Sequence, residues 1–166
     1  PGVPTAIVWF RKCLRLHDNA ALTWACESSE VDSILPVFVM DEELGSGGTG
    51  GIGFNRARFL VQSLRDLDDS LQRELGLRLR IVRGGYLETM EAIIKGLDGS
   101  TPYLAYEYCS EPKSLSVSAE ISGWELSGGM DFESRIFSGS HTLLDIEKTV
   151  SSENYSNPKS MKDMER

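Results

Sequence analysis

The residues that first indicate the fold are TAIVWFRKCLRLHDNAAL, positions 5–22. Positions 5–10 form a run of β-forming side chains without polar alternation, which is typical of a strand buried on both faces of a parallel sheet. A short polar stretch follows, and then Asp18 and Asn19, two good N-cap residue types, precede the helical stretch 19–29. A buried strand leading into a helix is the first unit of an α/β fold.

The same alternation continues along the chain. Strands are predicted at 33–41, 77–84, 101–108 and, less clearly marked, within 132–145; helices are predicted at 56–75 after an Asn55 cap, at 86–98 ending at Gly99, and at 114–129. The Ser- and Gly-rich composition of 114–129 predicts a weak or distorted helix. Pro36 lies inside the predicted strand 33–41, so the residue at which that strand begins is not fixed by the sequence. The pattern predicts an α/β fold, an open five-stranded parallel sheet with helices on both faces in a Rossmann-like three-layer sandwich, and strand 5–10 in its centre.

Composition indicates one ordinary globular domain with an acidic surface. The chain has 166 residues, 40% of them hydrophobic and 25% charged, and a net charge of −8. Phosphate contacts need clustered Lys and Arg, so we expect no direct nucleic-acid binding by this domain alone. No apolar run approaches membrane-spanning length, so we expect no membrane contact.

Cysteine and histidine usage argues against several kinds of site. Cys13, Cys26 and Cys109 are odd in number and form no C-x-x-C, which favours reduced thiols and an intracellular protein of the cytoplasm or nucleus. The two histidines, His17 and His141, are too few for a histidine-built metal site, and neither has a Ser or Cys partner at a recognisable spacing. We therefore expect neither a metal nor a catalytic residue.

The segment GSGGTGGIGFNR, 45–56, contains the pattern G-x-G-x-x-G at 48–53. A dinucleotide fingerprint follows directly on a strand and has an acid about 20 residues further on. Here the pattern begins seven positions after Asp41, and the next strand ends at Arg83 and Gly84 without an acid. We therefore interpret 45–52 as a mobile loop that does not bind NAD or NADP.

The segment VWFRKCLRLHDNAAL, 8–22, resembles the opening of the photolyase/cryptochrome family of flavoproteins. The resemblance continues in order through VFVMD, GFNRARFLVQSLRDLDDSL, LRIVRG, YEYCSEP and SHTLLDIEK, and so covers residues 5–148. It is most similar in character to six-four photolyases and animal-type cryptochromes. The resemblance implies a photolyase/cryptochrome-like α/β domain at 1–150 and a polar linker or tail at 151–166, with the family's helical FAD-binding domain absent.

This resemblance implies an antenna-type domain of a blue-light flavoprotein, either a DNA photolyase or a cryptochrome photoreceptor. The chain, truncated before the FAD domain, would be photochemically inactive alone, and its partner would be that helical domain or another protein. The alternative is a stand-alone nucleotide- or partner-binding α/β module that has lost photochemistry. Trp9, Trp24 and Trp124 are expected to pack in the core rather than to form the family's electron-transfer chain.

The resemblance also implies a candidate site, because this family binds an antenna pigment, a deazaflavin or a folate, near the carboxyl ends of the strands. With the strand order 3-2-1-4-5, the crevice at the topological switch point lies between strands one and four. The candidate antenna residues there are Arg11, Lys12, Asp41, Asn55, Arg56, Cys109 and Glu111.

The chain departs from the family at Cys109-Ser-Glu-Pro, where members with an acid show D-x-E-P, and it lacks the Arg-Asp pair expected near Val117 and Ser118. A thiol accepts hydrogen bonds more weakly than a carboxylate, so Cys109→Asp is predicted to strengthen deazaflavin binding.

The loop before the first helix gives a separate structural prediction. We expect Asp18 to cap that helix and to form an ion pair with Arg11.

Overall fold

The computed structural model describes residues 2–41, 52–97, 101–109, 111–128 and 130–138. The elements in chain order are β1 (Thr5–Phe10), α1 (Ala20–Glu27), β2 (Ser33–Met40), α3 (Phe54–Leu75), β3 (Arg80–Arg83), α4 (Tyr86–Lys95), β4 (Tyr103–Glu107), α5 (Pro112–Ser127) and β5 (Glu133–Phe137). Strands and helices alternate throughout this part of the chain, as the sequence predicts.

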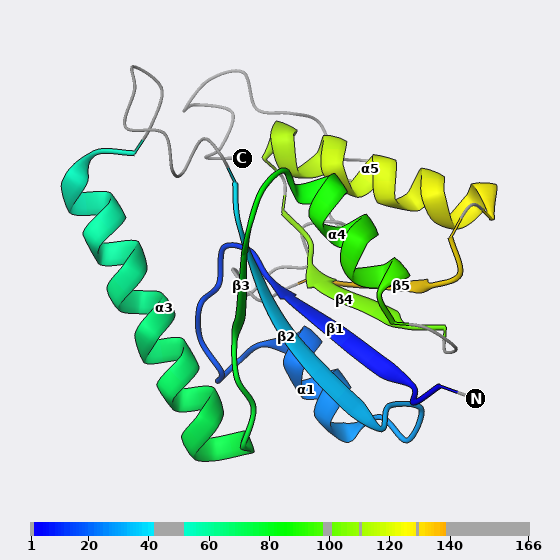
Figure 1. The fold of residues 1–166 in the computed structure, drawn as a ribbon, viewed down its shortest axis with the longest axis horizontal. Helices are drawn as coiled ribbons and strands as arrows, with labels where there is room; N and C mark the ends of the chain where they lie inside the picture. The colour runs from blue at the N-terminus through cyan, green and yellow to red at the C-terminus, as the bar shows by residue number, and fades with distance from the viewer. Residues whose placement is uncertain (1, 42–51, 98–100, 110, 129, 139–166) are drawn as a thin grey trace, which may run out of the picture.

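The five strands form one parallel sheet in the order β3-β2-β1-β4-β5, so β1 is central and the predicted topology is confirmed (Figure 1). Trp9 of β1 is in register with Val37 of β2 on one side and with Tyr106 of β4 on the other. Pro36 is accommodated inside β2, where the pairing with β3 begins only at the next residue, Val37.

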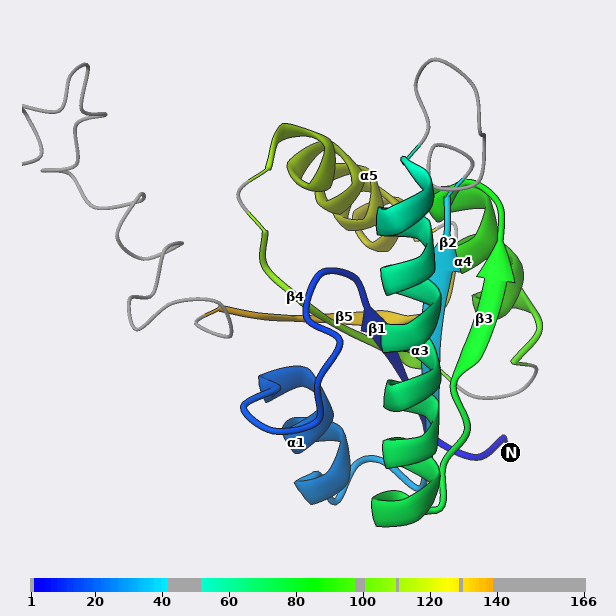
Figure 2. The same ribbon diagram turned by 90° about the vertical axis from the view of Figure 1, so that its left-hand side faces the viewer.

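Helices cover both faces of the sheet. Ala6, Val8 and Phe10 point to the face covered by α1 and α3, whereas Ile7 and Trp9 point to the face covered by α4 and α5 (Figures 1 and 2). All six residues of β1 are buried, which explains why this strand shows no polar alternation. Trp9 is fully buried, and Trp24 and Trp124 are half-buried against the two cores, so the predicted packing role is confirmed.

Several predicted helix ends are corrected. Helix α3 begins at Phe54 after Gly53, so Asn55 lies inside its first turn and is not its cap. Helix α4 ends at Lys95 with Gly96 as its C-cap, earlier than predicted. Helix α5 is a regular helix of 16 residues rather than a distorted one; it begins with Pro112 and ends at Ser127, with Gly128 as its C-cap in the left-handed conformation.

The loop after β1 also differs from the prediction. Asn19, not Asp18, caps α1, because its side-chain oxygen accepts a hydrogen bond from the Leu22 amide at 3.0 Å. Asp18 adopts φ 54° and forms its ion pair with Arg15 at 2.9 Å rather than with Arg11. Asp18 can take this backbone conformation because Asp and Asn tolerate the left-handed region better than most residues.

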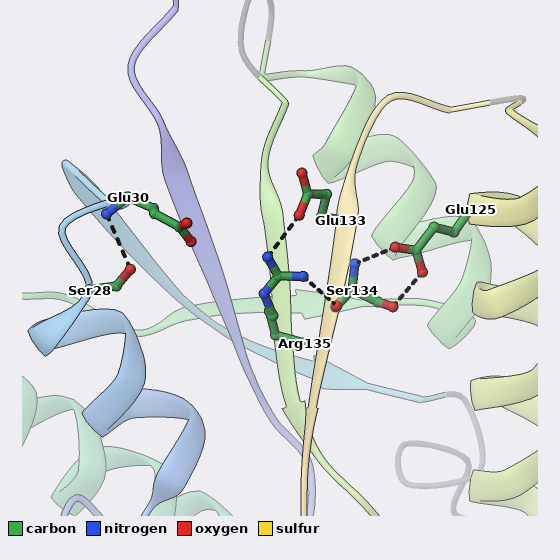
Figure 3. Close-up of polar contacts among 6 residues, drawn as sticks. All are labelled: Ser28, Glu30, Glu125, Glu133, Ser134 and Arg135. Atoms are coloured by element: carbon green, nitrogen blue, oxygen red, sulfur yellow. Dashed lines mark hydrogen bonds and ion pairs between the residues drawn. The ribbon is translucent and has the colours of Figure 1, made fainter.

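Edge strand β5 is partly covered by a side chain of α5. The Glu125 carboxylate accepts hydrogen bonds from the Ser134 amide, at 3.0 Å, and from its hydroxyl (Figure 3). On the same strand Arg135 forms an ion pair with Glu133 at 2.8 Å and lies over the Tyr103 ring. An edge amide that is already bonded is less available for pairing with another chain.

Some predictions concern residues outside the described ranges: the loop 45–51, Gly99, the segment 139–145 and the tail 151–166. The linker assignment and the proposed mobility of the glycine-rich loop stay predictions. Among the described residues, no helix is both long and apolar enough to cross a membrane.

Candidate functional site

A pocket of about 580 Å³ opens at the carboxyl ends of β1 and β2. Its apolar wall combines the ends of these strands with one side of α3, and its apolar lining residues include Phe10, Leu14, Phe38, Val39, Phe59 and Leu60. This volume lies within the range of small-molecule and cofactor sites. Carboxyl-end crevices are where ligands bind in doubly wound sheets, so the pocket is the leading candidate site.

Four cationic side chains line the pocket: Arg11, Lys12, Arg56 and Lys113. Two of them meet acids. Lys12 forms an ion pair with Glu111 at 2.8 Å, and Lys113 forms one with Asp41 at 2.7 Å. The hydrogen bond from Lys12 lowers the pKa of the Glu111 carboxyl. The Lys113–Asp41 pair joins the end of β2 to the first turn of α5, and Asp41 is almost fully buried behind it.

Arg11 is held in place by aromatic rings and by α5. Its guanidinium carbon lies 4.7 Å from the centre of the Trp9 ring and 5.5 Å from that of Tyr106, within the range of cation–π contacts. Its nitrogens also donate to the Ser114 carbonyl at 3.4 Å and the Ser118 hydroxyl at 3.5 Å. Burial lowers the pKa of Arg11, although an arginine stays protonated at neutral pH. A cation is therefore fixed at one side of the pocket.

Tyr86, the first residue of α4, adds an aromatic ring to the pocket wall. Its ring centre lies 5.7 Å from that of Trp9, and the Lys113 ammonium lies 5.5 Å from the ring centre. Burial raises the pKa of the Tyr86 hydroxyl, so the group is neutral at physiological pH. Tyr86 and Phe59 give the pocket aromatic surface suited to a planar ligand.

The first turn of α3 reaches the pocket with Asn55 and Arg56. This turn contains no acidic residue, and Gly53 provides no side-chain cap. The free amides and the partial positive charge of a helix N-terminus attract anions, and Arg56 adds a full positive charge. The pocket thus combines apolar and aromatic walls with a predominantly cationic rim.

The structure brings most of the predicted site residues together. Arg11, Lys12, Asn55, Arg56 and Glu111 line this one pocket. Asp41 stands behind it through its ion pair with Lys113.

Cys109 is half-buried and is not among the lining residues. Its contribution to a ligand site, like ligand binding by the other residues, stays a prediction.

Tyr86, Ser114 and Phe59 line the pocket but were not predicted from the sequence, and Lys113 was predicted only as the end of the loop 107–113 at the switch point. The sequence did point to the position of Lys113 and Ser114, because they lie at the end of the loop after β4, which was expected at the switch point. It did not point to Tyr86 and Phe59, because each occupies an ordinary helical position until the helices are packed. Within the described ranges, no three His, Cys, Asp or Glu residues cluster as metal ligands.

A doubly wound parallel sheet with a cofactor-sized pocket at its carboxyl ends defines a class of cofactor- and nucleotide-binding domains. The family model for DNA photolyase matches residues 6–163, and the chain belongs to this family. It is 36% identical over 146 residues to a (6-4) DNA photolyase of Arabidopsis thaliana, an alignment covering 83% of this chain and 25% of that protein. It is 37% identical over 145 residues to cryptochrome-1 of Spalax judaei, covering 87% and 23%.

Solved structures agree with this assignment. A bacterial class III photolyase from Agrobacterium tumefaciens superposes with a TM-score of 0.62 at 25% identity, covering 81% of this chain and 26% of that one. An archaeal photolyase from Sulfolobus tokodaii, solved with two FAD molecules and taken to imply a novel light-harvesting cofactor, gives 0.66 at 26% identity, covering 80% and 29%. A Synechocystis cryptochrome gives 0.67 at 25% identity, covering 90% and 34%.

The matched part is the N-terminal α/β region of these proteins. The chain spans about a quarter of the length of the curated relatives it matches.

Proposed function

We propose that this domain holds a light-harvesting pigment in the pocket at the carboxyl ends of β1 and β2, within a blue-light flavoprotein. The observation that carries the proposal is the combination of aromatic walls, Tyr86 and Phe59, with a cationic rim that includes Arg11 and Arg56. Deazaflavins and folates are planar and carry anionic groups, so their chemistry matches both features. The domain itself collects light and performs no bond-making step.

The whole protein is proposed to be a DNA photolyase or a cryptochrome photoreceptor, with FAD bound by a separate helical domain. That helical domain is the proposed partner of this one. Phe59 supports this, because it lines the pocket yet is 70% exposed, so a covering domain would bury it and shield the pigment from water. The proposed division of labour places pigment binding here and flavin photochemistry elsewhere.

The experiment is a fluorescence titration of the purified chain with a deazaflavin, with a folate and with FMN as a comparison. We expect saturable one-to-one binding of one of the first two. Arg56→Ala should weaken it about tenfold or more, because hydrogen bonds to charged groups contribute about 1.5–3 kcal/mol. Arg73→Ala makes the same charge change on α3 outside the pocket and should leave the affinity unchanged.

The Cys109→Asp prediction is tested in the same titration. Tighter deazaflavin binding by the variant would extend the site from the lining residues to the loop after β4. An unchanged affinity would mean that position 109 does not face the ligand. If neither the wild type nor this variant binds any of the probes, the pigment proposal is wrong, and a partner-binding α/β module that has lost photochemistry becomes the better reading.

A further inference from the structure

The charges of α3 are segregated along its length. Residues 54–65 contain three arginines and no acid, a charge of +3, whereas residues 66–75 contain four acids and one arginine, a charge of −3. This order opposes the helix macrodipole, which favours acids near the N-terminus and bases near the C-terminus. An interaction within the helix therefore does not account for the arrangement.

One long stripe of α3 faces away from the sheet. Residues 54, 58, 61, 65, 69 and 72 recur every three or four positions and so follow one side of the helix. The stripe consists of Phe54, Arg58, Val61, Arg65, Asp69 and Gln72. Its two large apolar residues are exposed, Phe54 at 79% and Val61 at 41%. We call it the α3 outer stripe.

Among the residues that the structure describes, no other helix or strand covers this stripe. Figure 2 shows α3 on the near side of the molecule, with no other labelled element in front of it. A shallow groove of about 340 Å³ lies along its N-terminal half, between Phe54 and Arg65. Within the ranges that the structure describes, the side chains of Arg58, Arg65 and Asp69 form no hydrogen bond or ion pair.

We propose that the α3 outer stripe binds the same stripe of a second copy of this chain in antiparallel orientation. A two-fold axis near Ser63 places Arg58 of each copy opposite Asp69 of the other, and Phe54 opposite Gln72. The charges of the stripe itself then meet in two symmetry-related Arg58–Asp69 pairs, and the two macrodipoles also oppose each other. The occupant is a second copy because the stripe is complementary to itself, as an isologous interface requires.

The size of the stripe limits the affinity. A helix of 22 residues is about 33 Å long at about 1.5 Å per residue. A single pair of such helices buries less than the roughly 1,600 Å² of a standard stable interface. The dimer is therefore weak and reversible, with dissociation in the micromolar range or above, and its charge pairs make it sensitive to salt.

The test is sedimentation equilibrium of the chain over a wide range of concentration, at low and at physiological ionic strength. We expect a monomer–dimer equilibrium that shifts toward monomer as salt is added. Arg58→Asp and Asp69→Arg should each weaken the dimer by about tenfold, since each change turns two symmetry-related attractions into repulsions. Asp66→Arg is the matched control, because it makes the same charge change on the side of α3 that faces Leu16 and His17.

Mixing the two variants gives the sharpest result. A dimer of one Arg58→Asp copy and one Asp69→Arg copy contains two attractive pairs again, so the mixture should associate more tightly than either variant alone. Circular dichroism confirms that each variant is folded. A wild-type chain that stays monomeric at low salt up to about millimolar concentration overturns the proposal, as does a dimer that Arg58→Asp leaves intact or a mixture that stays monomeric. None of these outcomes bears on pigment binding, because neither Arg58 nor Asp69 lines the pocket.

Discussion

Helices α3 and α5 form for different reasons. Helix α3 carries its own pattern: Leu64, Leu67 and Leu71 are buried on one side and charged residues occupy the others. Helix α5 contains five serines and Gly123 among its 16 residues, a composition with poor helix propensity. Both are nevertheless regular helices, which shows that packing against the sheet can replace the local pattern.

The serines of α5 are tolerated because their hydroxyls bond within the helix. Ser116 donates to the Pro112 carbonyl at 3.1 Å, and Ser118 donates to the Ser114 carbonyl at 2.9 Å. These bonds satisfy the hydroxyl groups without breaking the helix, although they do not favour it. The stabilising contribution comes from Val117 and Ile121, which are buried in the core beneath the helix.

The largest effect is expected from removing one fully buried side chain of each helix. Leu71→Ala and Ile121→Ala should each lower the free energy of unfolding by about 2–5 kcal/mol, measured by urea denaturation. The helices should differ in local opening: hydrogen exchange should accelerate along α5 in Ile121→Ala more than along α3 in Leu71→Ala. If hydrogen exchange accelerates equally along the two helices, α5 does not depend on packing against the sheet more than α3 does.

The two C-caps should respond alike, because they depend on backbone conformation rather than on packing. Gly76 and Gly128 have φ values of 68° and 65°, and a Cβ at either position meets no atom within 4 Å. Alanine at either position should cost about 1–2 kcal/mol through left-handed strain alone. Thermal unfolding of both variants measures this, and a cost at only one of them would reveal a further contact there.

Gly123→Ala should have the opposite sign. Gly123 lies inside α5, and a Cβ there meets open space. The substitution should stabilise the protein by about 0.5–1 kcal/mol, because alanine loses less backbone entropy than glycine in a helix. Gln62→Ala on the exposed side of α3 is the control and should change stability by less than about 0.5 kcal/mol. If Gly123→Ala lowers the stability of the protein, the low helix propensity of glycine at this position is not what limits it.

The smallest effect concerns pH at the start of α5. Glu111 is the N-cap residue of α5, and the hydrogen bond from Lys12 lowers the pKa of its carboxyl group. A lowered carboxyl pKa adds stability above the unfolded-state pKa, and this contribution is lost as the pH falls through the folded-state value. Lys12→Ala should move the Glu111 pKa upward, toward its ordinary value, in an NMR titration. An unmoved pKa would show that Lys12 does not contact Glu111 in solution.

The sequence by itself was sufficient where the signal is local or lies in the order of elements. The unbroken apolar run of β1 predicted a central buried strand, and strand–helix alternation predicted the parallel sheet. Five candidate site residues could be placed at one crevice, because loops that follow neighbouring parallel strands meet at the same edge. The resemblance to the family rested on the same ordered segments.

The tertiary structure alone decided what depends on three-dimensional contact. Asp18 and Asn19 are both good caps in sequence, and only the path of the loop selects Asn19 and turns Asp18 toward Arg15. Tyr86 and Phe59 became pocket residues only because α3 and α4 pack around the ends of the strands. Helix α5 formed because the sheet offered a surface for Ile121 to bury against. Composition and spacing record propensity along the chain, whereas burial and partner choice are properties of segments that meet only after folding.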